Sequence, residues 1–163
     1  MIRILEDREK RFLKILKLYE EYNLPVLCGK INYPGNNKNT LEANLAFNVL
    51  YSLLIKEFKK FIIHRETDEG YDGKSLLLVL NMDKFEAKKL AVEIEESHPL
   101  GRIFDIDIYE GEVPVSRREL GFDERKCVFC DKNVRECSRE KRHKVEEVVR
   151  AINLKIQNFI SKG

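Results

Sequence analysis

The stretch GRIFDIDIY, residues 101–109, alternates apolar and acidic side chains. Read as a β-strand, which has a period of two, it directs its phenylalanine and isoleucine side chains to one face and Asp105 and Asp107 to the other. One face of this strand should therefore lie on a hydrophobic core. The other should carry two neighbouring carboxylates.

This pair of carboxylates has two interpretations. Residues i and i+2 of a strand lie about 7 Å apart along the backbone, so the side chains of Asp105 and Asp107 can reach one hard cation. Like charges at neighbouring positions repel each other and strands are poor in aspartate, so the pair favours a site for Mg²⁺ together with substrate phosphates. A solvated sheet face without a ligand is the alternative that the spacing leaves open.

Hydrophobic periodicity and turn residues predict the elements around this strand. They are a helix over 4–22, strands over 26–33, 61–65 and 76–80, and helices over 41–60, 84–97 and 145–160. Thr40 and Asp83 are the predicted N-caps of the two middle helices, and residues 67–74 are predicted as a loop. Without its terminal helices the chain reads strand, helix, strand, strand, helix, strand. That order predicts an α+β fold, a ferredoxin-like split βαββαβ sandwich with two helices on one face of an antiparallel sheet.

In this layout Asp105 and Asp107 would point away from the two middle helices, toward a face that the terminal helices could flank or partly cover. We expect a single domain over 1–163, with a core over 24–110 and a loop plus C-terminal helix over 111–163. The residues predicted to face the core from the two middle helices are Leu41, Leu45, Val49, Leu53 and Phe58, then Phe85, Leu90 and Ile94.

Composition narrows the class of protein. Charged residues make up 36% of the 163 residues, yet the net charge is only +2, which lacks the excess of positive charge typical of a dedicated nucleic-acid binder. No apolar run approaches the roughly 20 residues that span a bilayer, and the N-terminus is charged. We expect a cytoplasmic protein that binds neither nucleic acid nor membrane.

Three of the four cysteines lie close together with a histidine: Cys127, Cys130, Cys137 and His143. These are the ligand types of a Cys3His zinc site, and the first pair has the two-residue gap of a zinc knuckle. The alternative is a set of reduced cysteines packed under the C-terminal helix, with His143 serving the substrate or the start of that helix.

Basic residues are interleaved with these cysteines: Arg117, Arg118, Arg125, Lys126, Arg135, Arg139, Lys141 and Arg142. Each can lie on a solvated face. Guanidinium groups also match phosphate oxygens, so a basic cluster after an acidic pair indicates phosphoryl or nucleotidyl transfer.

Several motifs closely resemble the CitX family, the citrate lyase holo-acyl-carrier-protein synthases. They are the run 98–107, then Ser116-Arg117, Leu120-Gly121, Arg125-Lys126-Cys127, Cys130, Cys137 and 139–143, together with Asn32-Tyr33-Pro34-Gly35 and Lys38. The resemblance spans nearly the whole chain. It implies a nucleotidyltransferase-type enzyme that moves phosphoribosyl-dephospho-CoA from its triphosphoribosyl precursor to a serine of the apo acyl carrier protein of citrate lyase, releasing pyrophosphate.

Roles for individual residues follow from that reaction. Asp105 and Asp107 would hold Mg²⁺ against the triphosphate. The candidates to contact phosphate are Asn32, Gly35, Lys38, Arg102, Arg117 and Arg125. His98, or else His64, would accept the serine proton. His98 has an equally simple structural interpretation, as a residue that caps the preceding helix.

Two other functions remain open at this point. A zinc-knuckle nucleic-acid-binding module would present aromatic residues on the open sheet face, and a catalytically silent subunit of the lyase would not need the Asp pair. For the transferase, an acidic carrier protein could be steered by the basic C-terminal region, Arg139 and Arg142 included.

Overall fold

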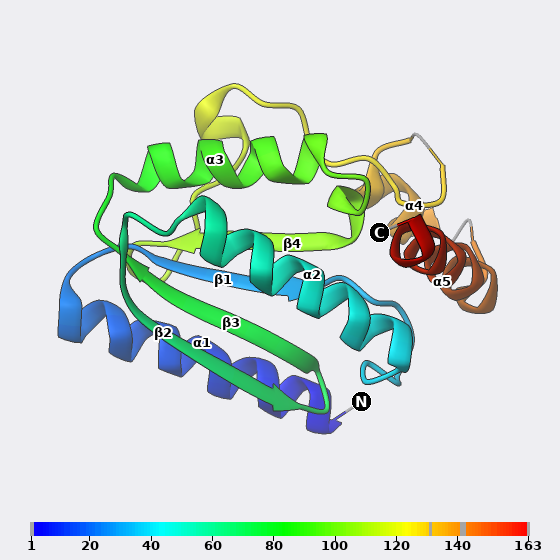
Figure 1. The fold of residues 1–163 in the computed structure, drawn as a ribbon, viewed down its shortest axis with the longest axis horizontal. Helices are drawn as coiled ribbons and strands as arrows, with labels where there is room; N and C mark the ends of the chain where they lie inside the picture. The colour runs from blue at the N-terminus through cyan, green and yellow to red at the C-terminus, as the bar shows by residue number, and fades with distance from the viewer. Residues whose placement is uncertain (1, 131, 141–142, 163) are drawn as a thin grey trace.

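The structure is a computed structural model that describes residues 2–130, 132–140 and 143–162. Its main elements are α1 (Ile2–Tyr22), β1 (Val26–Ile31), α2 (Leu41–Glu57), β2 (Ile62–Gly70), β3 (Gly73–Leu80), α3 (Lys84–Ser97), β4 (Phe104–Tyr109), α4 (Val134–Glu140) and α5 (Val145–Lys162) (Figure 1). Short 3-10 turns, η1 (Gly101–Ile103) and η2 (Arg118–Leu120), precede and follow β4. The α+β class and the order of the predicted elements are confirmed. The helix α4 was not predicted.

The strands form one four-stranded sheet in the order β2-β3-β1-β4, with each neighbouring pair antiparallel. β3 and β1 lie at the centre, as the unbroken apolar run of β3 predicts, since both faces of a central strand are covered. β4, which carries the Asp pair, is an edge strand.

Helices cover both faces of the sheet (Figure 1). On one face α2 and α3 bury the larger core, which includes Phe104, Ile106 and Ile108 of β4. On the other face α1 packs Ile15 and Leu18 against side chains of β1 and β3. The prediction that the first helix covers the second face is confirmed.

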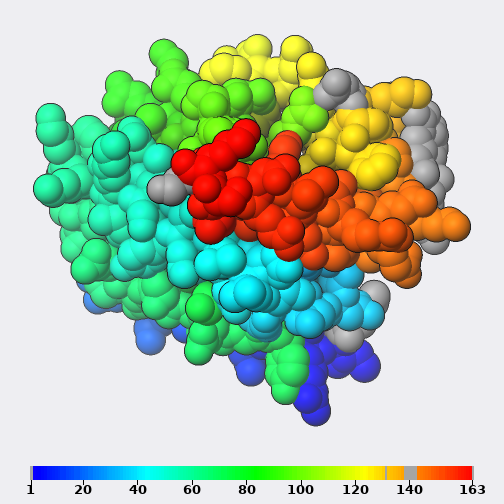
Figure 2. Space-filling view, turned by 45° about the vertical axis from the view of Figure 1, so that its right-hand side comes forward, coloured from blue at the N-terminus to red at the C-terminus, as the bar shows by residue number. Residues whose placement is uncertain are grey.

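α5 does not cover that second face. Its buried residues Ile152 and Ile156 belong to the larger core, and the helix contacts α2. Figure 2 shows α5, in orange to red, lying across α2, in cyan. The apolar stripe of α5 therefore extends the core on the same side of the sheet as the two middle helices.

The predicted loop over 67–74 is wrong. β2 continues to Gly70 and pairs with β3 through Thr67–Leu76, Asp68–Ser75 and Glu69–Lys74, so only two residues turn the hairpin. Charged residues hid this strand because β2 is an edge strand, where alternate side chains meet solvent.

The predicted N-caps are confirmed, because Thr40 accepts from the backbone N–H of Ala43 and Asp83 accepts from two backbone N–H groups of α3. The predicted buried sides are partly wrong. Leu41 is 71% exposed and Phe85 is 38% exposed, whereas Phe58 is fully buried. The residues of α2 that are buried are Ala43, Ala46, Phe47, Leu50 and Leu54.

The small residues explain that shift. A side chain on Gly29 of β1 would place its Cβ 2.5 Å from Cδ1 of Leu54, so α2 approaches the sheet where only glycine fits. Close approach of two backbones turns the alanine side of α2 inward, and the leucine side flanks it.

None of the helices that the structure describes is both long enough and apolar enough to cross a lipid bilayer.

Candidate active site

Asp105 and Asp107 lie on the same face of β4, as predicted, opposite the face that meets α2 and α3. The register with β1 places Lys30 directly across from Asp105 and Cys28 directly across from Asp107. Both carboxylates are partly buried. Within the described residues, neither makes a hydrogen bond or an ion pair, so both have their lone pairs open to a ligand.

The surroundings of Asp107 oppose its charge. Burial, and then the neighbouring Asp105 carboxylate, raise the pKa of Asp107 to about 6. Lys88 and Arg125 act in the opposite direction without cancelling this effect. A buried carboxylate beside a second one is held at a cost in free energy, and a cation between the two would remove that cost.

A basic cluster on the same face was missed by the sequence analysis. Lys30, Arg11 of α1 and Arg8 of α1 all bind the buried Asp72, at 3.0, 2.9 and 3.2 Å. Burial alone would raise the pKa of Asp72, but Lys30 and Arg11 outweigh it, so that pKa lies below its usual range. The cluster ties α1 to the β2–β3 turn beside the Asp pair.

The charges of Lys30 and Arg11 also act on Cys28, which lies directly across from Asp107. Burial raises the pKa of Cys28 to about 12, and the charges that act on this thiol include Arg11 and Lys30 as well as Asp105 and Asp107. These two cations and two carboxylates therefore all lie close enough to Cys28 for their charges to act on its thiol. The alternation of side chains along β1 predicts which residues share a face with Lys30. Only the pairing register of β1 with β4 shows that Lys30 lies opposite Asp105.

Two of the predicted phosphate ligands are engaged by a buried carboxylate. Glu95 of α3 accepts from Arg117 at 2.7 Å and pairs with Arg125 at 3.7 Å, and its other bond is to the backbone N–H of Ile106. Arg117 also binds Glu96 at 2.6 Å, and Glu95 and Glu96 together raise the pKa of Arg117 against the effect of burial. Arg117 therefore connects the segment after β4 to α3 through Glu95 and Glu96. Glu95 in turn binds the backbone of β4 at Ile106.

A second group of predicted residues meets at a cavity of about 720 Å³. Asn32, Arg102 and Arg125 line it together with residues of the cysteine segment, which we define as residues 125–143, and of α5. Arg125 donates to the carbonyls of Gly101 and Arg102 at 3.2 and 2.8 Å, and Arg102 donates to the carbonyl of Cys127 at 3.4 Å. Figure 2 shows the yellow to orange cysteine segment beside α5 on this side of the molecule.

The loop after β1 closes the cavity on another side. Tyr33 is buried and donates its hydroxyl to Asn153 of α5 at 2.6 Å, while Lys38 donates to the carbonyl of Tyr33. Burial lowers the pKa of Lys38. Gly35 has a φ of +84°, which favours glycine, and lies against Val145. Lys38 therefore braces the loop that presents Asn32.

His98 lies on the opposite face of the sheet from the Asp pair. Its ring packs between Phe104 and Phe159, at 4.9 and 5.1 Å between ring centres, and burial lowers its pKa. Its Nδ1 accepts from the backbone N–H of Leu100, so the neutral ring carries its proton on Nε2 and has no free lone pair. This geometry suits the structural interpretation, a histidine that shapes the turn from α3 into β4.

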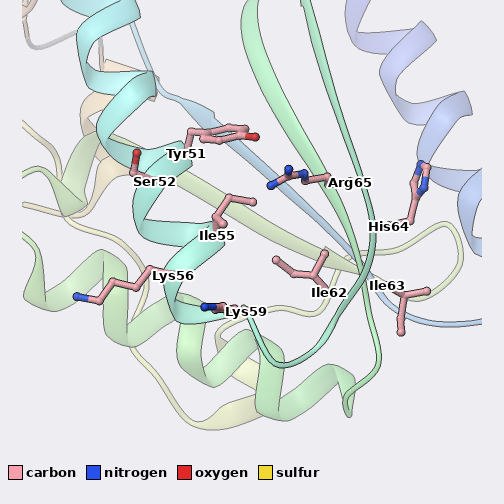
Figure 3. Close-up of a pocket in the computed structure, with 9 residues that line it drawn as sticks. All are labelled: Tyr51, Ser52, Ile55, Lys56, Lys59, Ile62, Ile63, His64 and Arg65. Carbon is pink, nitrogen blue, oxygen red and sulfur yellow. The ribbon is translucent and has the colours of Figure 1, made fainter.

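His64 is also distant from the Asp pair. It stands on β2, three strands from β4, which is about 14 Å at the usual spacing of strands. Its ring stacks on Tyr22 and its Nε2 contacts Glu66 at 2.9 Å. A hollow of about 910 Å³ separates β2 from α2, and Figure 3 shows Tyr51 and Arg65 pointing toward each other across it, with His64 turned to the other side.

The four predicted metal ligands of the cysteine segment come together. The Sγ atoms of Cys127, Cys130 and Cys137 and a ring nitrogen of His143 all lie within 4.8 Å of one another. The Sγ of Cys130 is 3.4 Å from the Sγ of Cys137 and 3.4 Å from Nε2 of His143. This Cys3His cluster could bind a metal ion. Of the two arginines expected to steer a partner, Arg142 falls outside the described residues, and the side chain of Arg139 is not described.

The face required by the nucleic-acid alternative is covered. Bases would stack on the side of the sheet away from α2 and α3, and there α1 buries Val26, Cys28, Leu77 and Val79. An open platform of aromatic side chains is the feature on which such modules depend. The structure therefore gives that alternative no support on this face.

Comparisons with known proteins agree with the motifs. The family described as apo-citrate lyase phosphoribosyl-dephospho-CoA transferase, CitX, matches residues 1–159. A probable apo-citrate lyase phosphoribosyl-dephospho-CoA transferase of Streptococcus pyogenes serotype M1 is 28% identical over 170 residues, which cover 99% of this chain and 86% of the relative. The corresponding transferase of Citrobacter koseri is 25% identical, over 90% of this chain and 82% of the relative.

A longer relative matches as well. The protein CitXG of Leuconostoc mesenteroides subsp. cremoris is 29% identical over 164 residues, which cover 98% of this chain but 35% of that protein. This chain thus spans about a third of CitXG and most of the shorter relatives. Because the family match extends over 1–159, the chain belongs to the CitX family of apo-citrate lyase phosphoribosyl-dephospho-CoA transferases.

Proposed function

We propose that this chain transfers phosphoribosyl-dephospho-CoA from its triphosphoribosyl precursor to a serine of the apo acyl carrier protein of citrate lyase, with release of pyrophosphate. The family match over 1–159 carries this proposal. The geometry adds a face with two carboxylates that have no hydrogen-bond or ion-pair partner among the described residues, and a cavity lined by arginines. The chain acts as a single domain over 1–163 in the cytoplasm.

The framework of the site is a ferredoxin-like sandwich. In the order β2-β3-β1-β4, β1 pairs with both β3 and β4, while β2 and β3 form a hairpin. α2 and α3 are the two crossover helices on one face, and α1 is an addition on the other. This topology supports the split βαββαβ arrangement.

The Asp pair is the proposed Mg²⁺ site. Asp105 and Asp107 fit a hard cation because both are carboxylates on one face and neither has a partner among the described residues. Burial, and then repulsion by Asp105, also raise the pKa of Asp107. Bound there, Mg²⁺ would neutralise charge on the triphosphate and on the departing pyrophosphate.

Basic residues on the same face complete the phosphate site. Lys30 stands directly across from Asp105 and shares the buried Asp72 with Arg11, so both can contact phosphate oxygens while keeping one bond to Asp72. Their charges favour the polyphosphate and position it against the carboxylates.

The cavity beside the loop is the proposed site for the rest of the nucleotide. Asn32 lies between the cavity and the start of β4. It lines the cavity, and its backbone N–H donates to the carbonyl of Ile103. Asp105 follows Ile103 by two residues, which is about 7 Å of extended chain. One extended phosphate-containing substrate can therefore contact Arg102 and Arg125 at the cavity and the carboxylates on β4.

The transfer is tested by intact-mass spectrometry. Purified protein is incubated with the apo acyl carrier protein, Mg²⁺ and triphosphoribosyl-dephospho-CoA, and the carrier should gain the mass of one phosphoribosyl-dephospho-CoA unit. The Asp105→Asn variant should lose nearly all activity. Glu57→Gln, which removes an exposed carboxylate at the end of α2, should retain it.

Each failure has a separate meaning. If the wild-type protein adds no mass to the carrier, the proposed activity is wrong. If the carrier is modified at the full rate by Asp105→Asn, the activity stands but the catalytic role of this face is wrong.

A further inference from the structure

The cysteine segment has almost no hydrophobic core of its own. Between residues 121 and 137, the described residues that are buried are Cys127 and Cys137, and Phe129 is 44% exposed. All four cysteines of the described chain are free thiols. A stretch of this length with so little buried apolar surface requires another source of stability, such as a metal ion.

The backbone nonetheless holds the segment in a defined shape. The N–H of Cys127 bonds the carbonyl of Lys132 at 2.6 Å, and the N–H of Val134 bonds the carbonyl of Arg125 at 3.0 Å. This narrow turn brings Cys127 and Cys130 to one side, and α4, which starts directly after it, adds Cys137 in its first turns. The three cysteine ligands therefore come from one turn and from the helix that follows it.

The distances between the ligand atoms match a tetrahedral ion. Zinc binds thiolate sulfur at about 2.3 Å in tetrahedral sites, which places two sulfur ligands about 3.8 Å apart. Here the Cys130–Cys137 and Cys130–His143 distances are both 3.4 Å, and no pair among the four ligand atoms exceeds 4.8 Å. Side-chain movements of up to about 1 Å would bring all four ligand atoms to zinc distance.

We propose that Cys127, Cys130, Cys137 and His143 bind one structural zinc ion that orders the cysteine segment and so builds one wall of the arginine-lined cavity. Four protein ligands complete the coordination, which leaves no open position for substrate or water. The role of the ion is therefore to hold the cysteine segment in its conformation and not to bind substrate. It fixes the carbonyl of Cys127, which accepts from Arg102, and the stretch that begins with Arg125.

Metal analysis tests the site without any assay of transfer. Full-length protein purified with a reductant and without chelator should contain one zinc ion per chain by inductively coupled plasma mass spectrometry. The Cys130→Ser variant should contain less than about a tenth of an ion per chain. Cys28→Ala is the matched control, because Cys28 is a buried free thiol under α1, outside the cluster, and that variant should keep one ion.

Two further measurements keep the test decisive if Cys130→Ser folds poorly. His143→Cys preserves four zinc-binding ligands and should keep one ion, whereas His143→Ala should bind zinc more weakly. Exchange of zinc for cobalt should produce the visible absorption bands of tetrahedral cobalt and a sulfur-to-cobalt charge-transfer band, both of which should be absent from Cys130→Ser.

Limited proteolysis tests the role of the ion. Removal of zinc by a chelator should expose sites within 125–143 to a protease while the sheet and α1–α3 stay resistant. The proposal is wrong if this protein, purified with its thiols reduced and without chelator, contains no zinc. It is equally wrong if Cys130→Ser retains zinc, or if metal-free protein resists cleavage as well as the native protein does.

Discussion

Replacing Asp107 with asparagine should stabilise the metal-free protein at neutral pH. The pKa of this carboxyl is raised from 3.8 to about 6, first by burial and then by Asp105. A shift of about two pKa units corresponds to about 3 kcal/mol of folding free energy, which is an upper value for a partly buried group. Asparagine has nearly the same shape and carries no charge, so Asp107→Asn removes this cost.

The sign of the effect fixes its pH dependence. A group whose pKa is higher in the folded state binds its proton more tightly there, so its stabilising contribution is complete below the unfolded pKa and is lost as the pH rises through the folded value. Below about pH 4, wild type and Asp107→Asn should therefore have equal free energies of unfolding. The advantage of the variant should grow between pH 4 and pH 6 and level off at up to about 3 kcal/mol above pH 7.

Urea denaturation followed by circular dichroism at several pH values measures this difference. Asp123→Asn, at an exposed aspartate, is the control and should change stability by less than about 0.5 kcal/mol at every pH. Saturating Mg²⁺ should stabilise the wild type at pH 8, by about 2.7 kcal/mol at a hundred times the dissociation constant, and should leave Asp107→Asn unchanged. The reasoning is refuted if Asp107→Asn is less stable than wild type at pH 8, because the carboxylate would then have a stabilising partner in the fold.

Three further substitutions test the framework, each by urea denaturation. Glu95→Gln should lose about 3–5 kcal/mol because it removes a buried carboxylate from two partly buried arginines, whereas Glu96→Gln, at an exposed partner of Arg117, should lose less than about 1 kcal/mol; equal losses would contradict the buried network. Asp72→Asn should lower the free energy of unfolding at pH 7. Because the pKa of Asp72 is lowered in the folded protein, this loss should shrink as the pH falls below the usual pKa of a carboxyl group. A loss that does not change with pH would count against the ion cluster. Gly101→Ala should lose about 1–3 kcal/mol or more, because its Cβ would lie 1.9 Å from the backbone oxygen of Glu95, and a variant as stable as wild type would show that this close approach can relax.

Local signals in the sequence were sufficient for much of the fold. Thr40 and Asp83 start their helices as predicted because a cap depends on residues one to three positions away. The alternation of residues 104–109 placed Asp105 and Asp107 on one face for the same reason, since strand geometry is local. The spacing of the cysteines likewise anticipated a cluster, because its ligands lie close together in the chain.

The features that were missed depend on contacts between distant segments. Lys30 and Asp105 become neighbours through strand register, and Asp72 meets α1 across more than sixty residues of chain. Glu95 reads as one more acidic residue on a charged helix, yet it is buried because the arginines that follow β4 fold back onto it. Neither register nor such a return of the chain is encoded in a local pattern.

The outer edge of β4 has a consequence for how molecules of this protein behave toward one another. Edge strands expose unpaired backbone groups that can recruit a strand from a second chain, which is a common route to aggregation. Here the N–H of Ile106 bonds Glu95 and its carbonyl bonds Lys88, both side chains of α3 and both buried. The strand that displays the carboxylates is thereby closed to intermolecular pairing at its centre, because both outward backbone groups of Ile106 already have partners within the chain.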